Sequence, residues 1–320
     1  MGFDTHTIKY LLAAQAGGVS FERVATIGRQ ALTLNARELR SVFEFFGERL
    51  SAGDAKAILE EADGYADELF RRLGAASVDS VDASEYESAT IIHDLNQPIP
   101  DDLRDRFTLL IDGGSLEHVF NVPVALRNCM EMVAIGGHYV SVNPANNFFG
   151  HGFYQFSPEL FFRAFSPENG YEVDRIIAFE TRPRSTWYLV RDPREVHRRV
   201  RLENRRPVHL IAQARRIVPA AIFAQTPQQF KYSDLWSDGD RKPPKRTPRG
   251  VFAHLHAAWK RETNRLIQAT VKPRFNPKVF ARVAPEPLRQ GRFESRADGV
   301  QPASASAPSN ASSSGATSQT

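Results

Sequence analysis

Three aspartates stand at the ends of short predicted strands, where carboxylates could bind a nucleoside. Asp82 ends SVDSVD, Asp94 ends ATIIHD and Asp112 ends FTLLID. A carboxylate in such a position can accept hydrogen bonds from both hydroxyls of a ribose, or from an adenine amino group. Aspartate also suits helix caps and turns. Both roles therefore stay open for Asp82, which precedes SEYES, and for Asp94, which precedes LNQP.

The stretch LLIDGGSLEHVFN (109–121) carries the densest set of candidate groups. Asp112 closes an apolar run, and burying a carboxylate there is costly unless it has a partner. Glu117 and His118 follow at an expected helix start, where the helix dipole stabilises an acid without any chemical role. The spacing of the His and acidic residues fits no metal motif such as H-E-x-x-H, and two neighbouring residues at a helix start converge poorly. We therefore expect no metal site, and His118 is a candidate catalytic residue with a structural role as the alternative.

The apolar pattern of residues 21–217 predicts alternating strands and helices. Strands are expected at 23–28, 77–84, 89–95, 107–112, 138–144, 171–180, 186–191 and 206–217. Helices are expected at 36–50, after a capping box from Asn35 to Glu38, and at 64–74 and 119–137. This alternation predicts a doubly wound α/β fold, with a mostly parallel sheet and antiparallel strands at one edge.

The predicted sheet brings the candidate residues together. In doubly wound sheets, ligands bind outside the carboxyl ends of the strands, where the strand order reverses. Gly28 and the three aspartates each follow or end such a strand. We therefore expect Gly28, Asp82, Asp94 and Asp112 at one rim of the sheet, forming a binding site.

The order of these pieces resembles that of class I S-adenosylmethionine-dependent methyltransferases. The match is clearest over residues 107–144, where an acid ends a strand, Leu-Glu-His-Val starts a helix, and Gly136-Gly137 precedes the next strand. The resemblance covers roughly residues 20–217 and implies S-adenosyl-L-methionine as cofactor. It implies that Asp82 binds the ribose and that Asp94 faces the adenine amino group. Asp112 would then lie near the cationic methionyl end, and the methyl acceptor would be a small molecule or a glycan.

The loop after the first strand departs from this family, which commonly has two or three glycines there. The sequence ATIGRQALTLN has only Gly28, followed by Arg29 and Gln30. One interpretation is a different loop in which Arg29 holds the cofactor carboxylate. The alternative is a methyltransferase-like binding or scaffold protein that has lost catalysis and contacts a partner through its basic C-terminal segment.

The segment NNFFGHGFYQFSPELFFRAF (146–165) follows the strand at 138–144, where the acceptor is expected to bind. His151 and Tyr154 are candidates for a position near the methyl acceptor, under a lid of aromatic side chains. The alternative is a loop followed by a core helix. That alternative is favoured for the three phenylalanines of PELFFRAF, namely Phe161, Phe162 and Phe165.

Composition narrows the cellular setting. The single cysteine, Cys129, excludes a disulfide framework and a cysteine-built zinc site. The N-terminus lacks the basic region of a signal peptide, and no apolar run is long enough to span a membrane. These features predict a cytoplasmic protein that does not associate with a membrane.

The charge is divided unevenly along the chain. Residues 1–190 carry 16 Lys and Arg against 27 Asp and Glu, whereas residues 191–292 carry 24 against 8. The basic segment 191–292 could contact an acidic partner, or it could complement the acidic half and form a solvated face. Nucleic acid is not the expected partner.

The chain is expected to divide into four parts. These are an N-terminal helix at 1–20, the α/β domain at 21–217, a basic linker with a C-terminal helix at 218–290, and a disordered Ser/Ala/Gly-rich tail at 291–320. Within the third part, SDGDRKPPKRTPRG (237–250) reads as the linker and residues 251–271 as an amphipathic helix.

Overall fold

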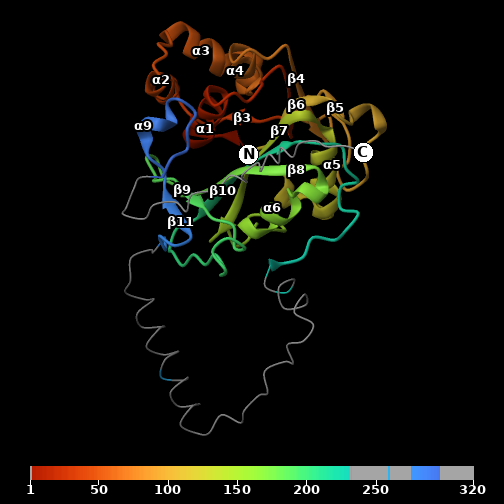
Figure 1. Ribbon diagram of the computed structural model, residues 1–320. Coiled ribbons are helices and arrows are strands. Elements are labelled where there is room, and N and C mark those ends of the chain that lie inside the picture. The colour runs from red at the N-terminus through yellow and green to blue at the C-terminus, as the bar shows by residue number, and fades with distance from the viewer. Residues whose placement is uncertain (1, 231, 233–258, 260–274, 296–320) are drawn as a thin grey trace, which may run out of the picture.

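A computed structural model describes residues 2–230, 232, 259 and 275–295 of the chain (Figure 1). The predicted linker at 237–250 lies outside the described residues, as does nearly all of the predicted helix at 251–271. The tail beyond residue 295 lies outside them too.

Within these described ranges, nine strands form one mixed sheet in the order β11-β9-β8-β10-β7-β6-β2-β4-β5. Their bounds are β2 Arg23–Ile27, β4 Ser77–Asp82, β5 Ile91–Ile92, β6 Phe107–Asp112, β7 Val133–Asn146, β8 Tyr171–Glu180, β9 Tyr188–Val190, β10 Val208–Arg216 and β11 Phe280–Arg282. Strands β5, β4, β2, β6 and β7 pair in parallel. From β7 outward through β10, β8, β9 and β11 every pair is antiparallel. The predicted doubly wound α/β fold with an antiparallel edge is confirmed.

The strand order reverses between β2 and β6. The chain passes from β2 outward to β4 and β5, then returns to β6 on the other side of β2. This reversal leaves a crevice at the carboxyl ends of β2 and β6, because the loops that leave the two strands run in opposite directions. A separate short parallel pair joins β1 (Gly2–Phe3), near the start of the chain, to β3 (Ala31–Leu32), which follows β2.

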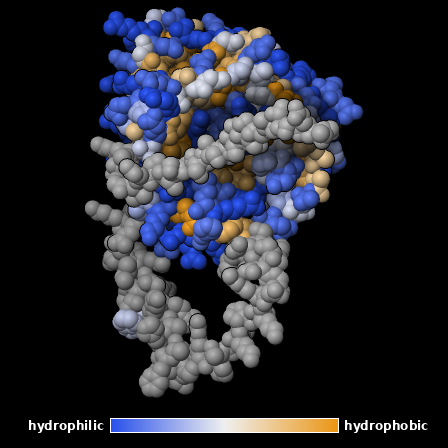
Figure 2. All heavy atoms as spheres, viewed as in Figure 1, coloured by the Kyte–Doolittle hydropathy of each residue, from blue (hydrophilic) through white to orange (hydrophobic). Residues whose placement is uncertain are grey.

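Helices cover both faces of the sheet (Figure 1). Helices α1 (Thr5–Ala16), α2 (Ala36–Phe45), α3 (Ala52–Glu60) and α4 (Asp67–Arg72) pack on one face, and α5 (Val122–Met132) and α6 (Pro158–Ala164) on the other. Successive side chains of β6 point to opposite faces of the sheet. Leu109 and Ile111 pack in the hydrophobic core under α1 to α4, and Leu110 packs in the core under α5 and α6. Most of the face visible in Figure 2 is polar, with apolar residues showing in patches between elements.

Two helix boundaries show how local chemistry sets the elements. The predicted capping box at the start of α2 is present, with Asn35 and Glu38 exchanging hydrogen bonds at 3.0 Å. The predicted helix at 119–137 is too long, because α5 ends at Met132 and β7 begins at Val133. The β-branched Val133 and Ile135, followed by two glycines, favour strand over helix.

The chain from residue 275 to 295 returns to the sheet. Strand β11 pairs with β9, and the short helix α9 (Pro285–Leu288) follows it. The ring of Phe293 packs 5.4 Å from that of Tyr10 on α1. The sequence pattern did not predict β11, and residues 291–295 pack against the fold although the tail was expected to begin at 291. In the described part of the chain, no helix is both long and apolar enough to cross a membrane.

Candidate functional site

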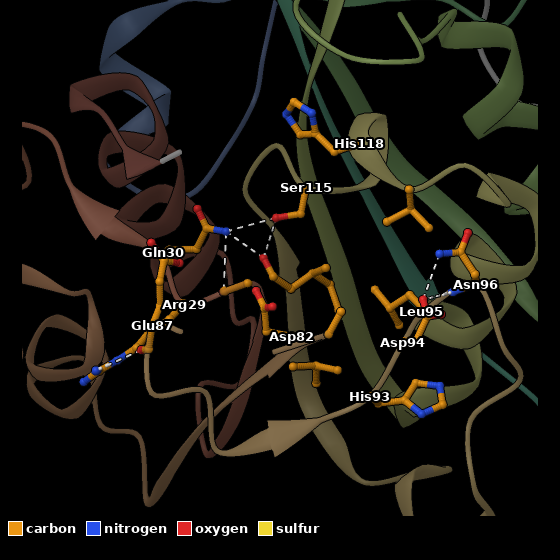
Figure 3. Close-up of a pocket in the computed structure, with 15 residues that line it drawn as sticks. Arg29, Gln30, Asp82, Glu87, His93, Asp94, Leu95, Asn96, Ser115 and His118 are labelled. Carbon is orange, nitrogen blue, oxygen red and sulfur yellow. Dashed lines mark hydrogen bonds between the residues drawn. The ribbon is translucent and has the colours of Figure 1, made fainter. Parts of the chain in front are cut away.

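A cavity of about 350 Å³ opens at the reversal of the strand order (Figure 3). Its walls come from the segments that follow β2, β4, β5 and β6. The lining includes four of the predicted cofactor residues on three of these segments, namely Gly28, Arg29, Asp82 and Asp94. Gln30, Asn96, Ser115 and His118 also line it.

Gly28 turns the chain at the end of β2. Its φ is +67°, in the left-handed region that favours glycine, and its N–H donates to the carbonyl of Val81 at 2.8 Å. A Cβ built at this position would lie 3.2 Å from Ser115 Oγ and 3.8 Å from Asp82 Oδ2. A side chain here would therefore enter the narrow space between the end of β4 and the segment after β6.

The side chain of Gln30 folds back over the loop after β2. The side chain is 3% exposed, and its Nε2 donates to the carbonyl of Ile27 at 2.6 Å. Ser115 donates to the same carbonyl at 2.7 Å, so the ends of β2 and β6 are joined at one acceptor. The oxygen Oε1 is buried with no hydrogen-bond partner among the described residues. The unusual loop is thus held by an amide that packs against Gly113, which the sequence alone did not reveal.

Arg29 lines the cavity, but its guanidinium is engaged with the cavity wall. Its Nε lies 3.3 Å from Asp67 Oδ2, and the group stacks 4.3 Å from the ring centre of Tyr65. It also donates to the carbonyl of Glu87 at 3.3 Å. These contacts fix the α4 side of the cavity, and the interpretation that Arg29 holds a cofactor carboxylate stays a prediction.

Asp82 and Asp94 both reach the cavity from strand ends. Asp82 Oδ1 accepts from the backbone N–H of Ser84 at 3.0 Å, and its carboxylate extends toward the middle of the space in Figure 3. Asp94 Oδ1 accepts from the backbone N–H and the side-chain amide of Asn96 at 2.9 and 2.8 Å. These hydrogen bonds from Asn96 lower the pKa of Asp94, so the group stays ionised at neutral pH. Asp94 therefore makes the predicted turn and also faces the cavity.

Asp112 differs from the other two, because it is completely buried and does not line the cavity. It accepts from the backbone N–H groups of Ser115 and Leu116 at 2.8 and 3.3 Å. Asn143 on β7 donates to its other oxygen at 2.7 Å. Burial raises the pKa of Asp112, and these hydrogen bonds oppose the rise. The observed contacts make Asp112 the acceptor that shapes the turn after β6, and its predicted cofactor contact stays a prediction.

Glu117, His118 and His151 form a cluster next to the cavity. Glu117 is 0% exposed, and burial together with the charge of Asp112 raises the pKa of Glu117 to about 8. One potential ligand atom from each of the three residues can be chosen so that all lie within 4.8 Å of one another. The expectation that Glu117 and His118 would converge poorly is wrong, because the short 3-10 turn Leu116–His118 replaces the expected helix start.

The segment after β7 brings His151 to this cluster. The backbone N–H groups of Phe153 and Tyr154 donate to the carbonyl of Glu117 at 2.8 and 3.2 Å. A Cβ on Gly152 would lie 2.8 Å from that same oxygen, so only glycine allows the close approach. The Tyr154 hydroxyl donates to the carbonyl of Phe120 at 2.6 Å and ties the loop down.

The helix that follows is part of the core, as predicted. Phe161 and Phe165 are 1% and 2% exposed, and Phe162 packs against the same core while partly buried. Asn143 is a further site residue that the sequence reading missed. The feature of the sequence that points to Asn143 is its place in the largely apolar strand HYVSVNP, because a buried amide there needs a hydrogen-bond partner.

No protein-family model matches the sequence, and no curated protein matches it. Among solved structures, a candidate S-adenosylmethionine-dependent methyltransferase from Listeria monocytogenes has a TM-score of 0.36 at 11% identity, over 64% of this chain and 99% of that one. The N-methyltransferase NodS from Bradyrhizobium japonicum WM9 has 0.35 at 12%, over 66% and 94%. A candidate methyltransferase from Bacillus halodurans C-125 has 0.34 at 10%, over 65% and 99%. These values carry no functional argument, so function is inferred from the chain's own residues.

Proposed function

We propose that the cavity binds S-adenosyl-L-methionine and that the protein transfers its methyl group to a small-molecule or glycan acceptor. The observation that carries this proposal is the meeting of Gly28, Asp82 and Asp94 around one cavity at the reversal of the strand order. A volume of about 350 Å³ lies within the usual range of small-molecule and cofactor sites, roughly 300–1,000 Å³. The residues also stand in the order that the methyltransferase resemblance implies.

Each side of the cavity suits one part of this cofactor. Asp82 would accept hydrogen bonds from the ribose hydroxyls, and the ionised Asp94 would accept from the adenine amino group. The methionyl end would then extend toward Ser115 and His118, on the side of the buried acids Asp112 and Glu117. Carboxyl oxygens on that side would favour the cationic ammonium and sulfonium groups, and a bound cation would in turn favour ionisation of the two acids.

The acceptor would enter beside the loop after β7. Phe120, Phe149 and Phe153 are exposed there at 71%, 100% and 66%, and the rings of Phe120 and Phe153 meet edge to face. Exposed aromatic rings bind apolar groups and the flat faces of sugars through their surface. His118 on the turn after β6 and His151 on this loop would be the groups that accept a proton from the acceptor, whereas the Tyr154 hydroxyl is committed to the carbonyl of Phe120.

The direct test is binding of S-adenosylhomocysteine, measured by isothermal titration calorimetry and by thermal shift. We expect the wild-type chain to bind and Asp82→Ala to lose at least about tenfold in affinity, equivalent to about 1.4 kcal/mol. Asp101→Ala is the matched control, because Asp101 is an exposed acid outside the cavity. Absence of any binding at millimolar ligand in the wild-type chain would overturn the proposal.

A second function, a binding or scaffold protein without catalysis, is favoured by Gln30. Its amide occupies the loop that the family commonly leaves to glycine, and it packs against Gly113. In this function the basic segment 191–292 would contact an acidic partner. The variant Gln30→Gly separates the two functions. Binding of S-adenosylhomocysteine by the variant but not by the wild-type chain would favour the scaffold, whereas binding by the wild-type chain favours the enzyme.

A further inference from the structure

The cluster of Glu117, His118 and His151 has the composition of a metal site. It offers one carboxylate and two imidazoles, from the turn after β6 and the loop after β7. Oε1 of Glu117 is buried and receives no hydrogen bond among the described residues, and it lies 3.6 Å from Nε2 of His151. The imidazole rings of His118 and His151 are 5.4 Å apart between centres. A buried oxygen that receives no hydrogen bond therefore lies beside the exposed imidazole of His151, in a cluster that also includes the exposed His118.

Glu117 and Asp112 form a buried pair of acids that a bound cation would stabilise. Glu117 and Asp112 are both 0% exposed, and both contact the same amide nitrogen of Asn143, at 3.3 and 2.7 Å. Within the described part of the chain, neither carboxylate forms an ion pair with a Lys or an Arg. Burying two neighbouring carboxylates is costly unless one of them takes up a proton or a positive charge compensates them. A divalent ion at the open side of Glu117 would supply that charge.

We propose that Glu117, His118 and His151 bind a divalent transition-metal ion, for which Zn²⁺ is the best match. Two imidazoles and one carboxylate are a donor set that suits Zn²⁺ and related ions better than Mg²⁺ or Ca²⁺, which prefer oxygen ligands throughout. Three protein ligands leave at least one coordination position for water or another molecule. Because His118 lines the cavity, that position lies next to the cavity.

The cluster needs only a small adjustment to close around an ion. Ligand atoms about 2.0 Å from a tetrahedral metal are about 3.3 Å from each other. The pair Glu117 Oε1 and His151 Nε2 is already close to this separation at 3.6 Å. Both imidazoles are on exposed side chains that can rotate, whereas the backbone bonds from Phe153 and Tyr154 to Glu117 hold the two segments together. Binding would therefore have to order two side chains on segments whose backbone is already held together.

The position of the site indicates a class of methyl acceptor, and this step rests on the proposed function. An oxygen atom of the acceptor could take the open coordination position, and a bound divalent ion lowers the pKa of a coordinated hydroxyl group. The ion would then take the place of His118 and His151 in promoting loss of the acceptor's proton, and it would favour an acceptor that is methylated on oxygen.

The test is metal binding by the full chain without any cofactor. After dialysis against a chelator, Zn²⁺ alone is titrated by calorimetry, and Co²⁺ serves as a spectroscopic probe of a four-coordinate site. We expect one ion per wild-type chain. His118→Ala and His151→Ala should each weaken binding at least about 100-fold, since even outer-shell partners of a metal ligand contribute about 10–100-fold.

The matched control is His93→Ala, which removes an imidazole from the same cavity but outside the cluster and should bind like the wild-type chain. Glu117→Gln, checked for folding by circular dichroism, should also lose binding while keeping the shape of the side chain. The proposal is overturned if the wild-type chain binds no stoichiometric ion, or if both histidine variants keep wild-type affinity. Failure of S-adenosylhomocysteine binding alongside intact metal binding would instead overturn only the proposed methyl transfer.

Discussion

Asp82 and Asp112 end two strands of the same sheet, on either side of β2, yet their surroundings are opposite. Asp82 is partly exposed and turns its carboxylate into the cavity, with a backbone N–H of the next turn on one oxygen. Asp112 is fully buried, and its oxygens accept from two backbone N–H groups and from Asn143. The difference shows that an acid at a strand end can be a ligand-binding group or a structural acceptor, and that burial decides between the two.

The largest expected effect is a difference in stability between alanine variants of the two aspartates. Asp112→Ala should lower the free energy of unfolding by about 3–5 kcal/mol, because it leaves two buried backbone donors without an acceptor and removes the shorter of the two hydrogen bonds from the Asn143 amide. Asp82→Ala should cost about 1 kcal/mol or less, since its carboxylate is open to solvent. Urea unfolding measures both, with Asp112→Asn as a near-isosteric control that should fall between them. Equal losses in the two alanine variants would show that burial does not distinguish the two aspartates.

Gly113 and Gly28, which lie next to Asp112 and Asp82, should differ in what an added methyl group disturbs. Gly113 lies where a Cβ would overlap Oε1 of Gln30 and come 2.7 Å from a ring carbon of Phe3, so Gly113→Ala should cost about 1–3 kcal/mol of stability through overpacking. Gly28→Ala should cost about 1–2 kcal/mol because of its positive φ. It should also weaken S-adenosylhomocysteine binding by about tenfold, because its methyl group would lie between Ser115 and Asp82.

Unfolding and binding measured on the same two variants separate these effects. A Gly113→Ala variant that keeps full stability would show that the Gln30 side chain moves freely and does not hold the loop. A Gly28→Ala variant that keeps full binding would show that the ligand does not approach the end of β2.

The sequence predicted those element boundaries at which the residue pattern changes sharply. Strand β6 ends at Asp112 as expected, because its apolar run stops at an acid and two glycines, and the Asn35 capping box marks the start of α2. It did not predict β11, whose three residues gain their structure only by pairing with β9. Short edge strands carry too little pattern of their own to be recognised.

The candidate site was predictable only in part, for a physical reason. Gly28, Asp82 and Asp94 meet because parallel strands end at one rim, which follows from the strand order alone. The cluster of Glu117 and His151 depends on how a loop docks, through Gly152 and the backbone bonds to the Glu117 carbonyl. Such long-range contacts between loops leave no periodic signal in the sequence.

The contrast between buried and exposed groups extends to His138 on β7. Its Nε2 lies 3.4 Å from Asp174, and the side chain also faces Arg215 and Arg175. Burial lowers the pKa of His138, the charge of Asp174 opposes this, and the two arginines add to the lowering. With the folded pKa below the unfolded value of about 6.5, the unfolded chain binds the proton more readily. The contribution of neutral His138 to stability is therefore present above about pH 6.5 and is lost as the pH falls below it.

His138→Asn should reduce this loss. Urea unfolding of the wild-type chain and the variant, compared between about pH 5 and pH 7.5, should show a shallower decline in the variant on the acid side. The effect should be the smallest of the three, because Asp174 offsets part of the cost of protonating the histidine. Asp174→Asn removes that offset and should steepen the acid decline. If His138→Asn leaves the slope unchanged, the histidine is protonated equally easily in the folded and unfolded chains, and burial does not control this group as it does Asp112.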